Sequence, residues 1–125
     1  MRNFKGTVLR PYQLYVAEFT QTAGDIALLR VIYNDMDAVP DITPGLITAG
    51  NYRLQIQNTK DLNIGEDSVV NVNTELVYTS HANSKIESFL SEDHSEIFIL
   101  NIDMSFSSLS DIDGSFVLYL YKYIN

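Results

Sequence analysis

The chain has 125 residues, no Cys and a formal net charge of −8, and 46% of its residues are hydrophobic. This length suits one domain with a single hydrophobic core. The lack of Cys excludes a disulfide framework and a Cys-based zinc site. Phosphate backbones and anionic lipid surfaces attract clustered positive charge, so the acidic balance argues against nucleic acid and membrane as partners.

The first residues carry basic side chains, Arg2, Lys5 and Arg10, but no apolar stretch follows them. We therefore predict no signal peptide. No segment approaches the roughly 20 apolar residues that a membrane helix requires. We expect one β-sandwich domain over residues 1–125, in which residues 1–11 can form an extended N-terminal arm, and we expect the chain to be made in the cytoplasm.

Alternation of apolar and polar residues dominates the first half of the chain and predicts β-strands. In Tyr12–Thr20 one face carries Tyr15, Ala17 and Phe19 and the other carries Leu14, Val16 and Glu18, which predicts a half to fully buried strand. Ile26–Tyr33 is an apolar run broken only by Arg30, which is typical of a central strand buried on both faces. Pro and Gly punctuate residues 34–50, which predicts a long loop, with a short strand around Leu46 as an alternative.

The second half continues the pattern. Asn51–Gln57 alternates most cleanly, with its apolar residues inward and its polar residues outward. After a polar turn at residues 58–67, Ser68–Thr79 predicts another strand, whereas Lys85–Leu90 fits either a strand or one helical turn. Glu96–Met104 has apolar residues on both faces. With the last strand, the chain predicts an all-β fold, an antiparallel β-sandwich or jelly-roll of seven or eight strands.

The last predicted strand, Ser115–Tyr123, is apolar on both faces. One face carries Phe116, Leu118 and Leu120. The other face carries the residues that we predict as an interface: Val117, Tyr119, Tyr121 and Tyr123. A strand with one face in water alternates apolar with polar residues, so we expect both faces to be covered.

Three interpretations of these tyrosines stay open. They can form a second buried layer of the core, an interface with another copy or another protein, or a platform on which sugar rings stack. Tyr is enriched at protein interfaces because its ring offers a large amphipathic contact area. The chain has no Trp, the residue best suited to a sugar platform, which weighs against the third interpretation.

No catalytic, cofactor or metal signature rises above background. Residues 111–114 (DIDG) resemble part of a calcium loop, but the first and twelfth positions would fall on Leu109 and Leu120, which lack side-chain oxygens. The acidic group at residues 92–96 (EDHSE) fits a solvated loop better than a metal site. The chain has two His residues and no nucleophile elbow, so we predict no catalytic, cofactor-binding or metal residues and no enzymatic activity.

Three segments carry a resemblance to a known class of proteins. YVAEFTQT (residues 15–22), GNYRL (50–54) and GSFVLYLY (114–121) are similar to segments of small β-sandwich virion proteins of tailed bacteriophages, which serve as head fibres, capsid decorations or tail components. The resemblance implies a non-enzymatic structural protein of the virion. It also implies self-association, as in a trimer, and docking to other capsid or tail proteins.

The main alternative belongs to a different class. A carbohydrate-binding or adhesin-like module would use exposed Tyr side chains to bind a glycan, such as one on a host surface. The acidic charge, the absence of Cys and the over-apolar last strand fit the structural protein, which we take as the leading hypothesis.

Overall fold

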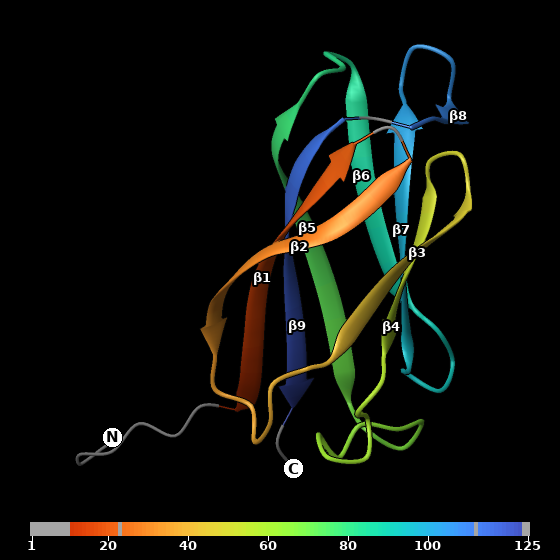
Figure 1. The fold of residues 1–125 in the computed structure, drawn as a ribbon. Coiled ribbons are helices and arrows are strands. Elements are labelled where there is room, and N and C mark those ends of the chain that lie inside the picture. The colour runs from red at the N-terminus through yellow and green to blue at the C-terminus, as the bar shows by residue number, and fades with distance from the viewer. Residues whose placement is uncertain (1–10, 23, 112, 124–125) are drawn as a thin grey trace.

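The computed structural model describes residues 11–22, 24–111 and 113–123, and the regular secondary structure within them is entirely β-strand. Two antiparallel sheets face each other (Figure 1). This arrangement confirms the expected antiparallel β-sandwich. Residues 1–10 of the predicted N-terminal arm lie outside the described residues, and Pro11 is exposed immediately before the first strand.

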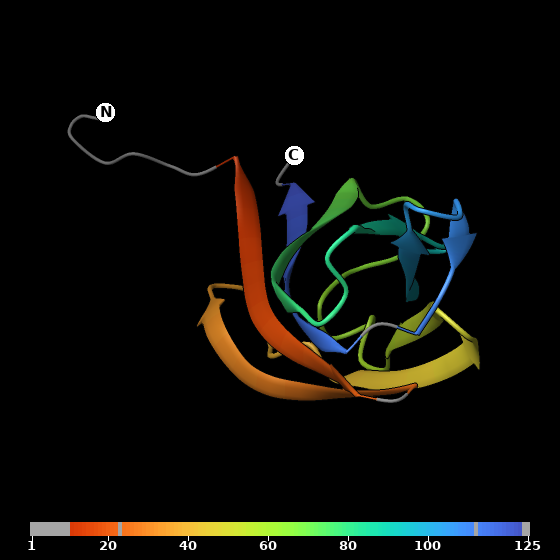
Figure 2. The same ribbon diagram turned by 90° about the horizontal axis from the view of Figure 1, so that it is seen from above.

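Nine strands form the two sheets within the described residues. Sheet A contains, in spatial order, β2 (Asp25–Asn34), β1 (Tyr12–Thr22), β9 (Gly114–Tyr123) and β5 (Val70–Thr79). Sheet B contains β3 (Ile42–Thr48), β4 (Asn51–Ile56), β7 (Glu96–Asp103) and β6 (Ser84–Leu90), and the short β8 (Ser108–Leu109) pairs with β7. Seen from above, the two sheets enclose the space in which the core lies (Figure 2).

The core consists of the inward-facing residues of both sheets. In sheet A, Phe19 of β1 and Phe116 of β9 are direct cross-strand partners, and their rings stack with centroids 5.5 Å apart and planes 13° apart. Sheet B contributes Tyr52, Leu54 and Ile97, which are fully buried. Burying a side chain of this size stabilises the fold by roughly 1.5–3 kcal/mol. The alternation predicted for the fourth strand is thereby confirmed.

Two loops predicted from sequence contain more structure than expected. The Pro- and Gly-punctuated stretch contains the strand β3, which confirms the alternative around Leu46. The polar turn at residues 58–67 carries two buried apolar residues, Leu62 and Ile64, that join the core. Backbone hydrogen bonds such as Ile64 N to the Thr59 carbonyl (2.8 Å) fix the conformation of this turn. Lys85–Leu90, for which the sequence allowed either a strand or one helical turn, belongs to the strand β6.

The prediction that Ile26–Tyr33 forms a central strand is wrong, because β2 lies at the edge of sheet A. Its pairing with β1 skips Leu29 and Ile32, so β2 contains two β-bulges. A bulge inserts an unpaired residue and disturbs the alternation of faces. The apolar run therefore reflects a bulged edge strand and not a strand covered on both sides.

A bulge also explains a smaller departure in β5. The pairing of β5 with β9 skips Val77, so the alternation of inward and outward side chains shifts between Leu76 and Tyr78. Leu76 packs against the core, whereas Tyr78, which alternation alone would place beside it, is 63% exposed.

Gly50 lies where the β3–β4 hairpin contacts the loop between β8 and β9. It has a positive φ of 74°, and a Cβ placed on it would lie 2.4 Å from the Ser110 backbone nitrogen. Because both the backbone strain and the clash oppose a side chain, Gly50→Ala should lower the free energy of unfolding by about 1–3 kcal/mol. Urea unfolding measures the change.

Gly65→Ala is the matched control, since nothing lies within 4 Å of a Cβ there. It should leave stability unchanged or raise it slightly through reduced entropy of the unfolded chain. Equal effects of the two substitutions would contradict the assigned role of Gly50.

Candidate interaction surfaces

The predicted interface on β9 lies on the outer face of sheet A. Phe116, Leu118 and Leu120 point into the core, and the alternate residues point away from sheet B. Val117 is 7% exposed and Tyr123 is 37% exposed, while Tyr119 and Tyr121 are partly buried. Within the described chain, therefore, these four residues lie on one face but are not the layer between the two sheets.

Neighbouring side chains of the same sheet cover the upper part of this face. Val117 lies between Glu18 of β1 and Glu75 of β5, its cross-strand partners. Glu18 is itself buried and accepts a 2.9 Å hydrogen bond from Arg30 Nε on β2. The guanidinium neutralises a carboxylate held largely away from water, which makes burial of Glu18 tolerable.

The tyrosines gather at the opposite end of the face. The ring of Tyr12 contacts Tyr121 edge-on (5.3 Å between centroids) and Tyr123 (6.0 Å). Partial burial, and then the neighbouring phenols of Tyr12, Tyr119 and Tyr123, raise the pKa of Tyr121. Edge-on contacts of this kind stabilise an aromatic cluster beyond its buried area. The sequence predicted the β9 residues of this cluster but not Tyr12.

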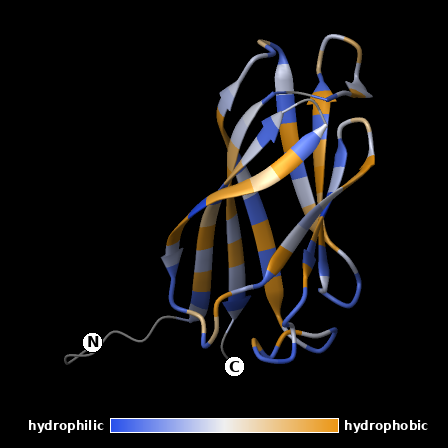
Figure 3. Ribbon diagram, in the orientation of Figure 1, coloured by the Kyte–Doolittle hydropathy of each residue, from blue (hydrophilic) through white to orange (hydrophobic). Residues whose placement is uncertain are grey.

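Exposed apolar residues also lie along β2 and β3, elsewhere in the fold, and Figure 3 colours part of the β2 ribbon as hydrophobic. We define the β2–β3 strip by its exposed apolar residues: Leu28, Leu29, Val31 and Ile32 of β2, and Leu46 and Ile47 of β3. All are at least 43% exposed, and Leu29 reaches 56%. Contiguous exposed apolar patches are uncommon on monomeric proteins and mark interaction sites. Sequence reasoning missed this surface because it took β2 as covered.

Two features of the fold leave the strip open. Leu28 and Val31 are the partners of Phe19 and Ala17, and so share the core-facing side of sheet A. They lie at the sheet's edge, beyond the cover of sheet B, and are exposed although their partners are fully buried. The bulged Leu29 and Ile32 add apolar area that no neighbouring strand covers.

The strip itself carries no charge, but both of its ends are acidic. Asp25 begins β2, and the loop that joins β2 to β3 carries Asp35, Asp37 and Asp41; all four residues are exposed. The nearest basic side chain on β2, Arg30, already binds Glu18. A partner that complements this surface would therefore combine apolar side chains with positive charge.

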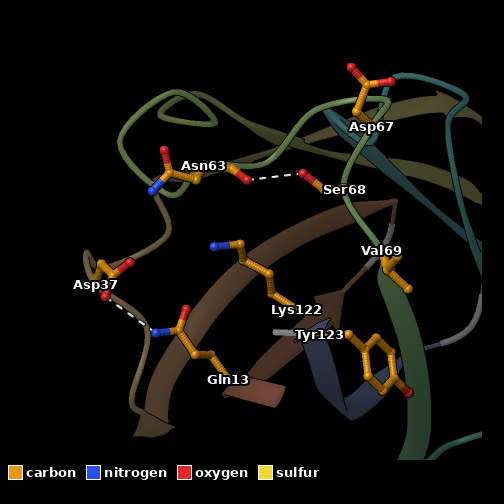
Figure 4. A pocket seen from close by; sticks show the side chains of 8 residues that line it. All are labelled: Gln13, Asp37, Asn63, Asp67, Ser68, Val69, Lys122 and Tyr123. Carbon is orange, nitrogen blue, oxygen red and sulfur yellow. Dashed lines mark hydrogen bonds between the residues drawn. The ribbon is translucent and has the colours of Figure 1, made fainter. Parts of the chain in front are cut away.

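A polar pocket of about 410 Å³ lies where β1 begins and β9 ends (Figure 4). Lys122 extends into it, and Gln13 Nε2 donates to Asp37 Oδ1 (3.2 Å) at its rim. Asp67 and the 63–69 segment close the other side. The pocket is open and polar, with one ammonium group and two carboxylates, and suits a small polar group more than an apolar ligand.

The polar clusters noted in the sequence bind separate partners within the fold. Asp93 accepts hydrogen bonds from Ser91 and Ser95, which lower its pKa to about 2. His94 Nδ1 lies 2.9 Å from the Gly65 carbonyl oxygen, and Glu96 pairs with Arg53 (3.2 Å). In the part of the chain that the structure describes, no three His, Asp or Glu residues are grouped to hold a metal ion.

The other histidine is likewise held in a structural contact. His81 Nε2 lies 3.0 Å from Asp103 Oδ2, beside the turn that connects β5 to β6. The neighbouring Ser84 hydroxyl donates to the carbonyl oxygen of His81 (2.9 Å). That contact uses the backbone of His81, so it does not constitute the hydroxyl-to-imidazole hydrogen bond of an activated serine.

Asp111, part of the calcium-like fragment, ties the 105–114 loop to the β3–β4 hairpin. Its Oδ1 accepts hydrogen bonds from the Gly50 backbone nitrogen (2.9 Å) and from the Tyr52 hydroxyl (3.1 Å). Burial, and then the charge of Asp111 and its hydrogen bond, raise the pKa of Tyr52 to about 12. Asp113 and Asp25 add smaller contributions in the same direction.

The raised pKa of Tyr52 makes stability depend on pH at the alkaline end. The folded state favours the neutral phenol, so this contribution is complete below the usual value of 10 and is lost as pH rises through 12. Its size is about 2–3 kcal/mol. Tyr52→Phe should therefore make the decline of unfolding free energy between these pH values shallower, as measured by urea titrations at several pH values.

Tyr78→Phe, which removes an exposed hydroxyl, is the control and should retain the wild-type slope. A Tyr52→Phe protein with the same alkaline slope as the wild type would show that the hydroxyl is not what titrates.

Comparison with known proteins adds no relative to these observations: no family model, no curated protein and no solved structure matches the chain. The described residues contain no helix long and apolar enough to cross a membrane. The surfaces available for assigning a function are thus the β2–β3 strip, the tyrosine face of β9 and the polar pocket.

Proposed function

We propose that this chain is a non-enzymatic structural protein that acts by self-association and by docking to other proteins of a bacteriophage virion, as a head fibre, capsid decoration or tail component. The observation that carries the proposal is the β2–β3 strip, where six apolar side chains are exposed on two strands that contact each other. Placing them against another protein removes this area from water, with a gain of roughly 25 cal/mol per Å².

The remaining features support the same assignment. The polar clusters of the described residues bind partners within the fold, and neither histidine contacts a candidate nucleophile in the hydrogen bonds above. The resemblance to phage virion proteins supplies the biological setting of the proposal, the virion of a phage assembled in the host cytoplasm.

The proposal predicts a homo-oligomer that depends on the strip. Light scattering should give a mass above the 14.1 kDa of one chain at micromolar concentration, and a trimer is the expected form. Replacing Leu29 and Ile32 together by Asn should return the mass to that of one chain, because the polar side chains retain water at the contact. Exposed positions tolerate such changes with little loss of stability.

The matched control replaces two exposed apolar residues outside the strip, Val77 and Phe106, by Asn. This variant should assemble as the wild type does. A wild-type protein that stays at 14.1 kDa and does not bind phage particles would remove the basis of the proposal.

One observation favours a second function, glycan binding on the tyrosine face. Tyr121 and Tyr119 lie directly across from Asn71 and Asn73 of β5, so partly buried aromatic rings have exposed amides beside them on the outer face of sheet A. Sugar recognition uses this combination, since apolar ring faces stack on aromatics while hydroxyls bond to amides.

A glycan array tests this second function. Under it, binding should disappear in the double variant Tyr119→Ala and Tyr121→Ala, whereas Tyr78→Ala, an exposed tyrosine off this row, should bind normally. Circular dichroism confirms that each variant is folded. An array without any reproducible hit would eliminate glycan binding and leave the structural role.

A further inference from the structure

We propose that residues 1–10 of one copy dock on the β2–β3 strip of a neighbouring copy. This inference rests on the proposed function, self-association, and specifies which parts of two copies meet. It begins from the distribution of charge along the chain. Residues 1–10 contain three basic residues and no acidic residue, whereas residues 11–125 contain five basic and sixteen acidic residues, a formal charge of −11.

The composition of residues 1–10 complements the strip. Their basic side chains, Arg2, Lys5 and Arg10, match the exposed aspartates at the two ends of the strip. Their apolar side chains, Phe4, Val8 and Leu9, match the uncharged apolar area between those ends. Opposite charges around an apolar contact favour association and fix its register.

The lengths also agree. Ten residues extend over at most about 33–36 Å, and β2, with ten residues, has a length of about 33 Å. The segment can therefore follow the strip from one acidic end to the other. Docking would proceed through side chains, because the two bulges of β2 interrupt a regular backbone ladder along its edge.

A second copy of the strip is a poorer occupant. If two β2 strands pair antiparallel about their middle, Asp25 of each copy lies beside Asn34 and Asp35 of the other. Carboxylates from both copies then gather at each end, and like charges brought together at an interface weaken it. Residues 11–125 carry a net negative charge in each copy, so the basic residues 1–10 complement the strip better than a second strip does.

Because the proposed function is self-association, we assign the strip to a neighbouring copy. Leu14 N donates to Asp35 Oδ1 (2.6 Å) and Asp35 N donates to the Leu14 carbonyl (3.1 Å), which fastens the start of β1 to the β2–β3 loop. Pro11 thus lies near the acidic loop at one end of its own strip, and the mixture of variants below separates docking between copies from docking within one chain. Docking between copies is a head-to-tail contact, which closes into a ring such as a trimer if the rotation permits.

Two full-length variants and their mixture test the proposal. The arm variant carries Arg2→Glu, Lys5→Glu and Arg10→Glu; the strip variant carries Leu29→Asn and Ile32→Asn. Each alone should have the mass of one chain, 14.1 kDa, by sedimentation velocity. Their equimolar mixture should form a species of twice that mass, because the strip variant supplies a working arm and the arm variant a working strip.

A variant with Lys60→Glu, Lys85→Glu and Lys122→Glu controls for net charge, since it changes the charge equally on the body. It should assemble like the wild type. If the arm variant assembles as strongly as the wild type, the proposal is overturned. The contact then lies between residues 11–125 of two copies. A mixture that stays at 14.1 kDa would overturn docking between copies.

The failure of the broader function has a different signature. In that case the wild type itself has the mass of one chain, and the variants show no change from it. If the wild type, the arm variant and the strip variant all assemble equally well, self-association is retained. Docking of residues 1–10 on the β2–β3 strip is then rejected.

Discussion

The insertion of β9 between β1 and β5 is the constraint on which the rest of the structure depends. β9 pairs along its whole length with both neighbours, and its inward residues meet those of sheet B. Because β9 occupies the middle of sheet A, β2 is left as the outermost strand beside β1. The open β2–β3 strip and the outward tyrosines of β9 both follow from this strand order.

Much of the fold could be predicted from alternation alone, because period-2 patterns report which face of a strand is buried. The β4 segment shows this best: Tyr52, Leu54 and Ile56 are buried as their spacing predicted. Alternation fails where bulges shift the register, as at Leu29 in β2 and Val77 in β5. It also cannot reveal apolar residues isolated in polar turns, such as Leu62.

The candidate site was harder to predict, because edge and centre strands can share one composition. The sequence correctly marked β9 as apolar on two sides, and it placed Tyr119 and Tyr121 together. Which strand lies at the edge depends on pairings between distant segments, which one sequence does not display. The buried Gln21–Asn101 pair between β1 and β7 is a further example, since neither residue type signals burial by itself.

The central place of β9 has a consequence for the order of folding. The hairpins β1–β2, β3–β4 and β6–β7 join segments close in sequence, so they can form while synthesis continues, whereas β9 follows every other strand. Loop closure over such a separation is slow, and folds dominated by distant pairings have low folding rates. Until β9 arrives, β1 and β5 each present an unpaired edge. We therefore expect completion of sheet A to be the late step of folding, so that a nascent chain becomes fully cooperative only after residues 114–123 leave the ribosome.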